Sequence, residues 1–284
     1  MLFFPNAKIN IGLNIIHKRP DGYHDIETVF CPIALSDVLE FVVAPEAPSG
    51  NVIFTASGIP VDGSPESNLC VKAYHLLANE FNLPALHVHL HKIIPMGAGL
   101  GGGSSDGAFM LKMLNENFQL GLSEDQLCDY ASQLGSDCAF FIKNRPLFGY
   151  ERGNRFRELP VFPSYMHIVL VNPGIHVGTA EAYAGVSPAK PTNSVEELVQ
   201  LPVEEWKNNM VNDFEKSVFR KHPGIGAIKD KLYETGAVYA SMTGSGSTVY
   251  GLYKETAPDL EAVFPECFVW KGKLLTQKQA SMYL

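Results

Sequence analysis

The stretch from Pro95 to Asp106, PMGAGLGGGSSD, concentrates glycine between an alternating apolar segment and an amphipathic one. Glycine loses more backbone freedom on folding than any other residue, so five glycines within positions 97–103 require a reason. They are expected where the backbone must approach a ligand without intervening Cβ atoms. The stretch leads into a predicted helix, whose N-terminal N–H groups suit a phosphate. The sequence therefore predicts a phosphate-binding loop.

Other glycine-rich motifs fit this loop less well. Gly97, Gly99 and Gly102 match the dinucleotide pattern G-x-G-x-x-G, which would imply a nicotinamide-dependent dehydrogenase, but the loop follows a proline and carries two glycines that a Rossmann turn does not need. A P-loop is excluded because Gly103 stands where its lysine belongs. A flexible linker does not usually lead into a well-capped helix. We therefore favour a phosphate loop of another kind.

Composition limits the class of protein. The chain has 284 residues, 46% hydrophobic and 18% charged, which suffices for one large or two modest packed domains. Its formal net charge of -8 argues against nucleic acid and anionic membranes as partners, and we interpret the basic stretch 152–157 as a solvated loop. Five scattered cysteines without C-x-x-C spacing argue against disulfides and structural zinc. With neither a signal-peptide pattern nor a long apolar run, we expect a soluble cytoplasmic protein.

Apolar periodicity predicts the order of the elements. Strands are expected over residues 9–16, 38–43, 87–94, 167–171, 238–242 and 248–253. Helices are expected from residue 105, over 124–134 with a capping box at Ser123 and Gln126, after Asn212, and from Pro223 to Gly236. Residues 149–163 are rich in Gly, Pro and Arg and are interpreted as a linker. The sequence thus predicts two α+β domains, residues 1–155 and 156–284.

Motifs in three places resemble the GHMP kinase superfamily, which includes galactose, homoserine, mevalonate and phosphomevalonate kinases. They are PNAKINIGL at residues 5–13, the glycine-rich loop, and MTGSGS at residues 242–247. The shorter matches DGYH at 21–24 and LGSD at 134–137 are similar to the branch that phosphorylates 4-diphosphocytidyl-2-C-methyl-D-erythritol in the non-mevalonate route to isoprenoid precursors. The resemblance covers essentially the whole chain. The sequence departs from the family pattern at Cys138-Ala139 and at Gly107. These differences do not change the charged residues of the expected site.

The resemblance implies a fold and an activity. The expected fold is α+β with two domains, a ribosomal-protein-like N-terminal domain and a ferredoxin-like C-terminal domain, and an active site in the cleft between them. The expected enzyme is an ATP-dependent kinase that phosphorylates the 2-hydroxyl of the cytidine-diphosphate-linked methylerythritol. Another GHMP kinase, such as a mevalonate or homoserine kinase, and a nucleotide-binding protein without activity stay open as alternatives.

Asp137 and Lys8 are the expected catalytic residues. A carboxylate beside the phosphate loop could accept the proton of the attacking hydroxyl, although Asp137 would equally suit a helix- or turn-capping role on sequence alone. Lys8 interrupts an apolar strand, where a surface position is the usual explanation. The resemblance places Lys8 next to Asp137, where an ammonium would keep the carboxylate ionised and stabilise charge that develops at the hydroxyl.

The resemblance also implies which residues bind the acceptor substrate. His24 would hydrogen-bond the cytosine edge, Tyr23 would stack on the ring, and Tyr183 would close its other side. Asn10 would contact the erythritol moiety, and Thr179 lies in the same segment as Tyr183. For Tyr183 the alternative is an ordinary core aromatic residue.

Binding of ATP with Mg²⁺ is expected at the loop. Lys8 or Lys92 would help to balance the phosphate charge, because the loop holds no lysine. No dedicated metal site is assigned: Mg²⁺ would arrive with ATP, with Ser105 as a candidate ligand. His87, His89 and His91 share one strand face, which we interpret as solvated rather than metal-binding. We expect a monomer or weak homodimer. The ATP-binding residues are expected to be Asn68, Pro95, Met96, Gly97, Ala98, Gly99, Leu100, Gly101, Gly102, Gly103, Ser104 and Ser105.

Overall fold

The computed structural model describes residues 1–160, 162–163 and 165–275 of the chain. Within them lie three four-stranded sheets, ordered β1-β4-β6-β5, β2-β3-β7-β8 and β10-β11-β9-β12. The strands are β1 Leu2–Phe3, β2 Asn6–Lys18, β3 His24–Ser36, β4 Val38–Val43, β5 Val52–Gly58, β6 Leu86–Lys92, β7 Leu147–Tyr150, β8 Arg155–Glu158, β9 His167–Asn172, β10 Tyr239–Met242, β11 Val249–Tyr253 and β12 Phe268–Lys273.

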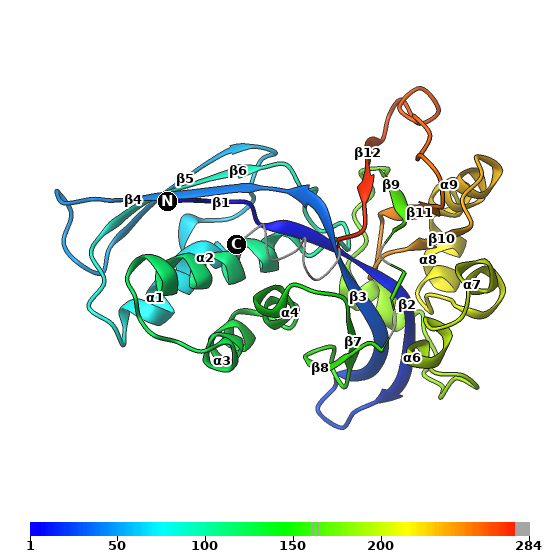
Figure 1. Ribbon diagram of the computed structural model, residues 1–284, viewed down its shortest axis with the longest axis horizontal. Helices are drawn as coiled ribbons and strands as arrows, with labels where there is room; N and C mark the ends of the chain where they lie inside the picture. The colour runs from blue at the N-terminus through cyan, green and yellow to red at the C-terminus, as the bar shows by residue number, and fades with distance from the viewer. Residues whose placement is uncertain (161, 164, 276–284) are drawn as a thin grey trace.

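Helices accompany the sheets at both ends of the molecule. They are η1 Pro65–Ser67, α1 Leu69–Ala78, α2 Gly102–Asn117, α3 Glu124–Leu134, α4 Cys138–Lys143, α5 Thr179–Ala184, α6 Val195–Leu198, α7 Val203–Asn209, α8 Glu215–Lys221 and α9 Pro223–Glu234. In Figure 1 the sheet that contains β4, β5 and β6 lies over α1 and α2 at one end, and β9 to β12 lie with α7, α8 and α9 at the other. The long strands β2 and β3 run between the two ends. This arrangement is the expected two-domain α+β fold.

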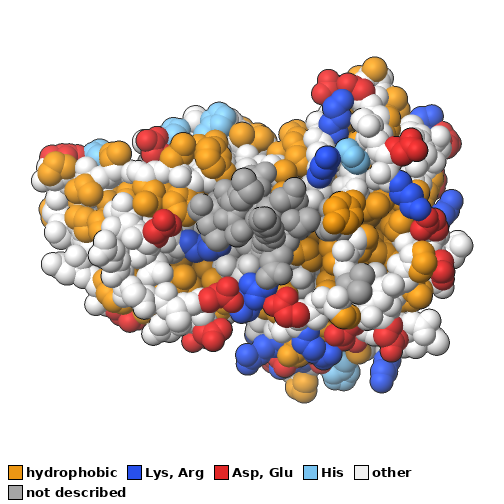
Figure 2. Space-filling model, viewed as in Figure 1, with side chains coloured by type: hydrophobic (Ala, Val, Ile, Leu, Met, Phe, Trp, Pro, Cys, Tyr) orange, Lys and Arg blue, Asp and Glu red, His pale blue; other side chains and the backbone are white. Residues whose placement is uncertain are grey.

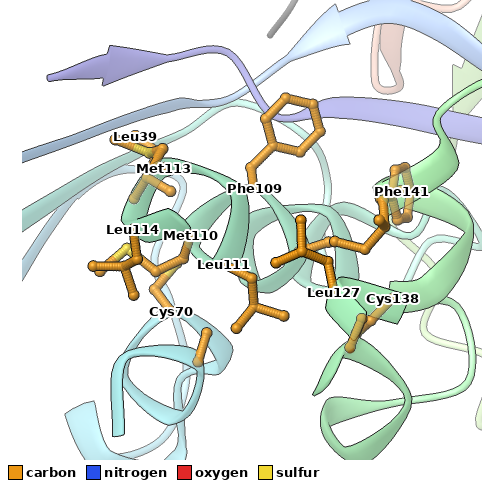
Figure 3. Close-up of a cluster of buried hydrophobic side chains, with 14 of the residues drawn as sticks. Leu39, Cys70, Phe109, Met110, Leu111, Met113, Leu114, Leu127, Cys138 and Phe141 are labelled. Atoms are coloured by element: carbon orange, nitrogen blue, oxygen red, sulfur yellow. The ribbon is translucent and has the colours of Figure 1, made fainter. Parts of the chain in front are cut away.

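Helix α2 is the centre of the N-terminal core. Phe109, Met110, Leu111, Met113 and Leu114 are all fully buried. Figure 3 shows that these side chains leave the helix in several directions, with Leu111 and Phe109 on different sides of it. A helix covered nearly all round gains its stability from packing, and this fixes the position of its first turn directly after the glycine-rich loop.

Local signals predicted several element boundaries. Helix α3 has the capping box: Ser123 accepts a hydrogen bond from the amide of Gln126, and the Gln126 side chain accepts one from the amide of Ser123. Helix α9 begins at Pro223 and buries Ile225. Helix α2 begins at Gly102, three residues before the expected position. Helix α8 begins after Phe214, and Asn212 bonds the Phe214 amide from outside the helix.

The predicted linker is wrong over most of its length. Residues 147–150 and 155–158 form β7 and β8, which pair with each other, and β7 pairs with β3. A tight turn in which Glu151 and Gly153 have positive φ joins them. The Gly- and Arg-rich composition therefore reflects this turn and a polar edge strand. The domain boundary at residue 155 falls within this hairpin and stays a prediction.

The histidines of β6 lie on the outer face of their sheet, as expected. Val88 and Leu90 are buried, whereas His87 and His91 are exposed. His89 lies within hydrogen-bond distance of Thr55 and Ser57 on β5. Figure 2 shows histidine side chains on the surface over β5 and β6. In the part of the chain that the structure describes, no group of three His, Cys, Asp or Glu side chains is arranged to hold a metal ion. No described helix is long and apolar enough to cross a membrane.

Candidate active site

A cavity of about 960 Å³ collects residues from all three motifs. Its lining includes Lys8 and Asn10 of the first motif, Gly244 and Ser245 of the third, and Asp137. Of the glycine-rich loop, Gly97, Gly99 and Gly101 line it. The expected acceptor residues Tyr23, His24, Thr179 and Tyr183 line it as well. Residues from both ends of the chain therefore meet in one cavity.

Lys8 lies in this cavity as a buried residue, so the surface explanation is wrong. Strand β2 is buried on both faces from Asn6 to Ile15, which leaves no solvated face for Lys8. Its Nζ lies 3.3 Å from Asp137 Oδ2 and donates a hydrogen bond of 2.6 Å to Asn10 Oδ1. Asp137 occupies the N-cap position of α4 without making a side-chain capping bond. The carboxylate of Asp137 therefore pairs with Lys8 and does not cap the helix. About a third of the Asp137 side chain is exposed.

The loop is attached to both other motifs by hydrogen bonds. The amide of Lys8 donates to the carbonyl of Leu100 at 3.0 Å, and Thr243 Oγ1 donates to the carbonyl of Gly99 at 3.0 Å. Thr243 Oγ1 also accepts from the amide of Asn10 at 2.9 Å. Gly99 has a φ of 76°, and a Cβ there would lie 2.1 Å from the carbonyl oxygen of Thr243. Only glycine allows this approach.

Several expected ATP-binding residues lie outside the cavity lining. Asn68 is the N-cap of α1 and accepts a hydrogen bond from the amide of Cys70 at 2.8 Å. Ser105 Oγ is buried and has no hydrogen-bond partner among the described residues. Leu100 is buried, Met96 is 43% exposed and Gly103 faces open space. Pro95, Ala98, Gly102 and Ser104 are likewise absent from the lining. Their roles in ATP binding stay predictions.

The aromatic end of the cavity brings together the residues expected to hold the cytosine, Tyr23, His24 and Tyr183, and their roles toward the base stay predictions. Tyr183 stacks on His24 itself, with ring centroids 4.7 Å apart and an interplanar angle of 19°. Phe214 meets the Tyr183 ring edge to face at 4.9 Å. The guanidinium of Arg152 lies 3.7 Å from the centroid of the Tyr23 ring. Tyr23 as a whole residue is 53% exposed. Burial, with the charges of Lys18 and His17, lowers the pKa of His24.

Some lining residues were missed in the sequence. Arg152 belongs to the basic stretch interpreted as solvated, yet it lines the cavity, and its Nε is buried without a hydrogen-bond partner among the described residues. Lys18 and His176 also line the cavity, and no motif in the sequence around them indicated a role in a site. Gly244 and Ser245 belong to the third motif, so the motif itself was a signal.

Lys92 does not reach the cavity. Its Nζ is buried between Asp37 and Asp106 and bonds both carboxylates. Burial alone would lower the pKa of Lys92, but Asp106 and Asp37 raise it above the usual value. The expectation that Lys92 balances ATP phosphates is therefore wrong, because its charge is already neutralised.

Comparison with known proteins identifies the family of both halves. The model of the GHMP kinases N terminal domain matches residues 68–145, and that of the GHMP kinases C terminal domain matches residues 194–269. The 4-diphosphocytidyl-2-C-methyl-D-erythritol kinase of Bacteroides thetaiotaomicron is 53% identical over 280 residues, covering 96% of this chain and 100% of the relative. The enzyme of the same name from Parabacteroides distasonis is 50% identical, with the same coverage.

Solved structures agree with this family. A crystal structure of 4-(cytidine 5'-diphospho)-2C-methyl-D-erythritol kinase superposes with a TM-score of 0.81 at 29% identity, covering 96% of this chain and 99% of the other. The mevalonate kinase of Methanococcus jannaschii shares the fold, with a TM-score of 0.73 at 16% identity and coverage of 97% and 98%. With half-identical relatives over nearly its full length and both domain models matched, the chain belongs to the GHMP kinases, in the family of the 4-diphosphocytidyl-2-C-methyl-D-erythritol kinases.

Proposed function

We propose that this protein transfers the γ-phosphate of ATP to the 2-hydroxyl of 4-diphosphocytidyl-2-C-methyl-D-erythritol in the cytoplasm. The observation that carries the proposal is the Lys8–Asp137 pair, which lies in one cavity with three glycines of the phosphate loop. The relatives that share about half of their residues with this chain are named as kinases of that substrate. Mevalonate kinase shares only the fold, at 16% identity, and is the weaker candidate.

Asp137 is the proposed general base. Lys8 lies 3.3 Å from its carboxylate and balances its negative charge, and the carboxylate can accept a proton from the acceptor hydroxyl. Asn10 accepts a hydrogen bond from Lys8 and so fixes the direction of the ammonium group. As the hydroxyl oxygen attacks the phosphorus, the Lys8 charge also stabilises the negative charge that builds on it.

The loop offers a fit for the triphosphate. Gly97, Gly99 and Gly101 line the cavity, so the backbone can approach phosphate oxygens without side chains between them. Helix α2 begins at Gly102 and directs its N-terminal amides toward the loop. The buried hydroxyl of Ser105 lacks a partner among the described residues and is the candidate ligand for Mg²⁺. Bound Mg²⁺ would neutralise part of the phosphate charge.

The other end of the cavity suits a cytidine diphosphate. A lowered pKa keeps His24 neutral near pH 7, so its ring offers one donor and one acceptor to the cytosine edge. Tyr183 supplies an aromatic surface beside it. Arg152 and Lys18 line this end and give it positive charge. We assign them to the diphosphate, which the planar guanidinium can bind with two hydrogen bonds.

The test is ³¹P NMR of the purified protein with Mg·ATP and the proposed acceptor, alongside Asp137→Asn. We expect a new phosphomonoester signal that grows with ADP in the wild type. We expect Asp137→Asn to lower kcat at least about a hundredfold, with ATP affinity nearly unchanged, because the base is lost and its shape is kept. Mevalonate and homoserine serve as control acceptors. Phosphorylation of either in preference would contradict the acceptor, and normal turnover in the variant would contradict the base.

A further inference from the structure

Asp37, Lys92 and Asp106 form a buried cluster beneath the glycine-rich loop, which we call the carboxylate–lysine clasp. Lys92 Nζ donates to Asp37 Oδ2 and, at 2.8 Å, to Asp106 Oδ2. All three side chains are at most 3% exposed. None of them lines the cavity, and the ammonium group of Lys92 is already bonded to both carboxylates.

The clasp joins the two ends of the loop. Lys92 is the last residue of β6, where the chain enters the loop, and Asp106 lies in α2, where the chain leaves it. On the entry side, Asp37 Oδ1 also accepts hydrogen bonds from the amides of Ile93 at 2.5 Å and Ile94 at 2.9 Å. The chain on both sides of residues 95–101 is therefore held by one set of charges.

The packing around the clasp is close. A Cβ on Gly102 would lie 2.8 Å from Lys92 Nζ and 2.9 Å from a methyl group of Ile94. Glycine at this position thus lets the first turn of α2 come down onto Lys92. Asp106 Oδ1 is buried and has no hydrogen-bond partner among the described residues, so Lys92 is the partner that holds the carboxylate. Removal of one member of a buried ion cluster leaves the others uncompensated.

We propose that Asp37, Lys92 and Asp106 are positioning residues that hold the glycine-rich loop in its phosphate-binding shape before ATP arrives. The proposal rests on the proposed binding of ATP phosphates by the loop. It assigns the cluster no contact with either substrate. Because the acceptor residues lie on other segments, a loosened clasp affects ATP and leaves acceptor binding unchanged.

The test uses Asp106→Ser, which removes the tie on the α2 side and leaves the Lys92–Asp37 pair. Hydrogen exchange without nucleotide should be at least about tenfold faster for amides 95–104, and unchanged in β9 to β11, because local opening becomes easier. The KM for Mg·ATP should rise about tenfold, with the KM for the acceptor within about twofold of the wild type. Asp106→Asn keeps an oxygen for Lys92 and should restore both values to within about threefold.

Lys229→Met is the matched control, since it breaks the ion pair with Glu215 in the other half of the molecule. We expect it to lower stability without a selective change in the KM for ATP. A folded Asp106→Ser variant with wild-type exchange in the loop would overturn the proposal, as would equal changes in both KM values. If the protein proved not to phosphorylate the acceptor, the exchange data alone would still decide whether the clasp orders the loop. If Asp106→Ser did not fold, rapid exchange of the Ile93 and Ile94 amides in the wild type would overturn the proposal.

Discussion

Single residues in this protein owe their roles to what the fold places around them. Lys8 stands between Ala7 and Ile9, and all three are buried because both faces of β2 are covered. A buried lysine needs a counter-charge, and Asp137 supplies it from a segment more than a hundred residues away. Arg152 is the converse case. It lies in a stretch that has the composition of a solvated loop, yet its guanidinium stacks on Tyr23 at the cavity.

We expect Arg152→Gln to weaken binding of the acceptor. If the guanidinium binds the diphosphate, its loss should raise the KM for the acceptor at least about tenfold and leave the KM for ATP unchanged. Calorimetric titration should find that CDP binds more weakly to the variant and that cytidine binds almost equally to both proteins. Arg155→Gln is the control, because Arg155 is exposed on β8 and does not line the cavity. Equal losses for CDP and cytidine would instead assign Arg152 to the support of Tyr23.

Secondary-structure elements were predictable where a local signal marks both ends. The capping box and Gly135 bound α3, and Pro223 begins α9. The hairpin of β7 and β8 was not predictable in this way, because its turn shares the composition of a linker and β8 is a short polar strand at the sheet edge. Helix α2 begins earlier than its periodicity indicates, since packing rather than propensity sets its first turn.

Helix α2 also carries a pH dependence of stability. Burial lowers the pKa of Lys112 from 10.5 to about 7, and its amine has one hydrogen bond, to the carbonyl of Phe141 at 3.1 Å. Between pH 7 and pH 10.5 the unfolded chain therefore binds more protons at this site than the folded protein, so this site's contribution to stability increases with pH.

We expect Lys112→Met to remove this dependence. The variant should exceed the wild type in stability by roughly 2 kcal/mol at pH 7, because no charge is left to desolvate, and the advantage should shrink toward pH 10. Guanidinium denaturation at both pH values measures the difference. Lys143→Met, which breaks a more exposed ion pair with Glu124, provides the comparison. An advantage that stays constant with pH would contradict this account.

At the scale of the whole molecule, the candidate active site is formed by three segments that are distant in the sequence. Strands β2 and β3 run between the two ends of the molecule, and the third motif comes from the loop between β10 and β11 (Figure 1). Thr243 joins all three motifs, since its hydroxyl bonds the backbone of both Asn10 and Gly99. An acidic chain thereby gathers Lys8, Lys18 and Arg152 around one cavity, which suits anionic substrates.

We expect Thr243→Val to damage stability and activity together. Valine keeps the shape of threonine but leaves the buried amide of Asn10 without its acceptor, which should cost about 2 kcal/mol of unfolding free energy. Both KM values should worsen, because the loop and the first motif lose their common anchor. Thr243→Ser keeps the hydroxyl and should perform better than Thr243→Val in denaturation and steady-state kinetics. Equal behaviour of the two variants would mean that the hydroxyl is not the anchor.

Local patterns were enough to predict the phosphate-loop segment, several helices, the strands β2, β4, β6, β9, β10 and β11 and, through the motifs, the family. They missed the long strand β3 and the strands β1, β5, β7, β8 and β12. The predicted features depend on residues close together in the chain, where backbone entropy, capping and periodicity act. The partners of Lys8, Lys92 and Arg152 were decided by tertiary structure. The partner of a charged side chain is the group that the fold places within a few ångströms of it, because electrostatic attraction weakens with distance. Asp137, Asp37 and Tyr23 reach these cations from other segments. Lys92 and Lys8 both adjoin apolar residues, yet folding buries one in the clasp and places the other in the cavity.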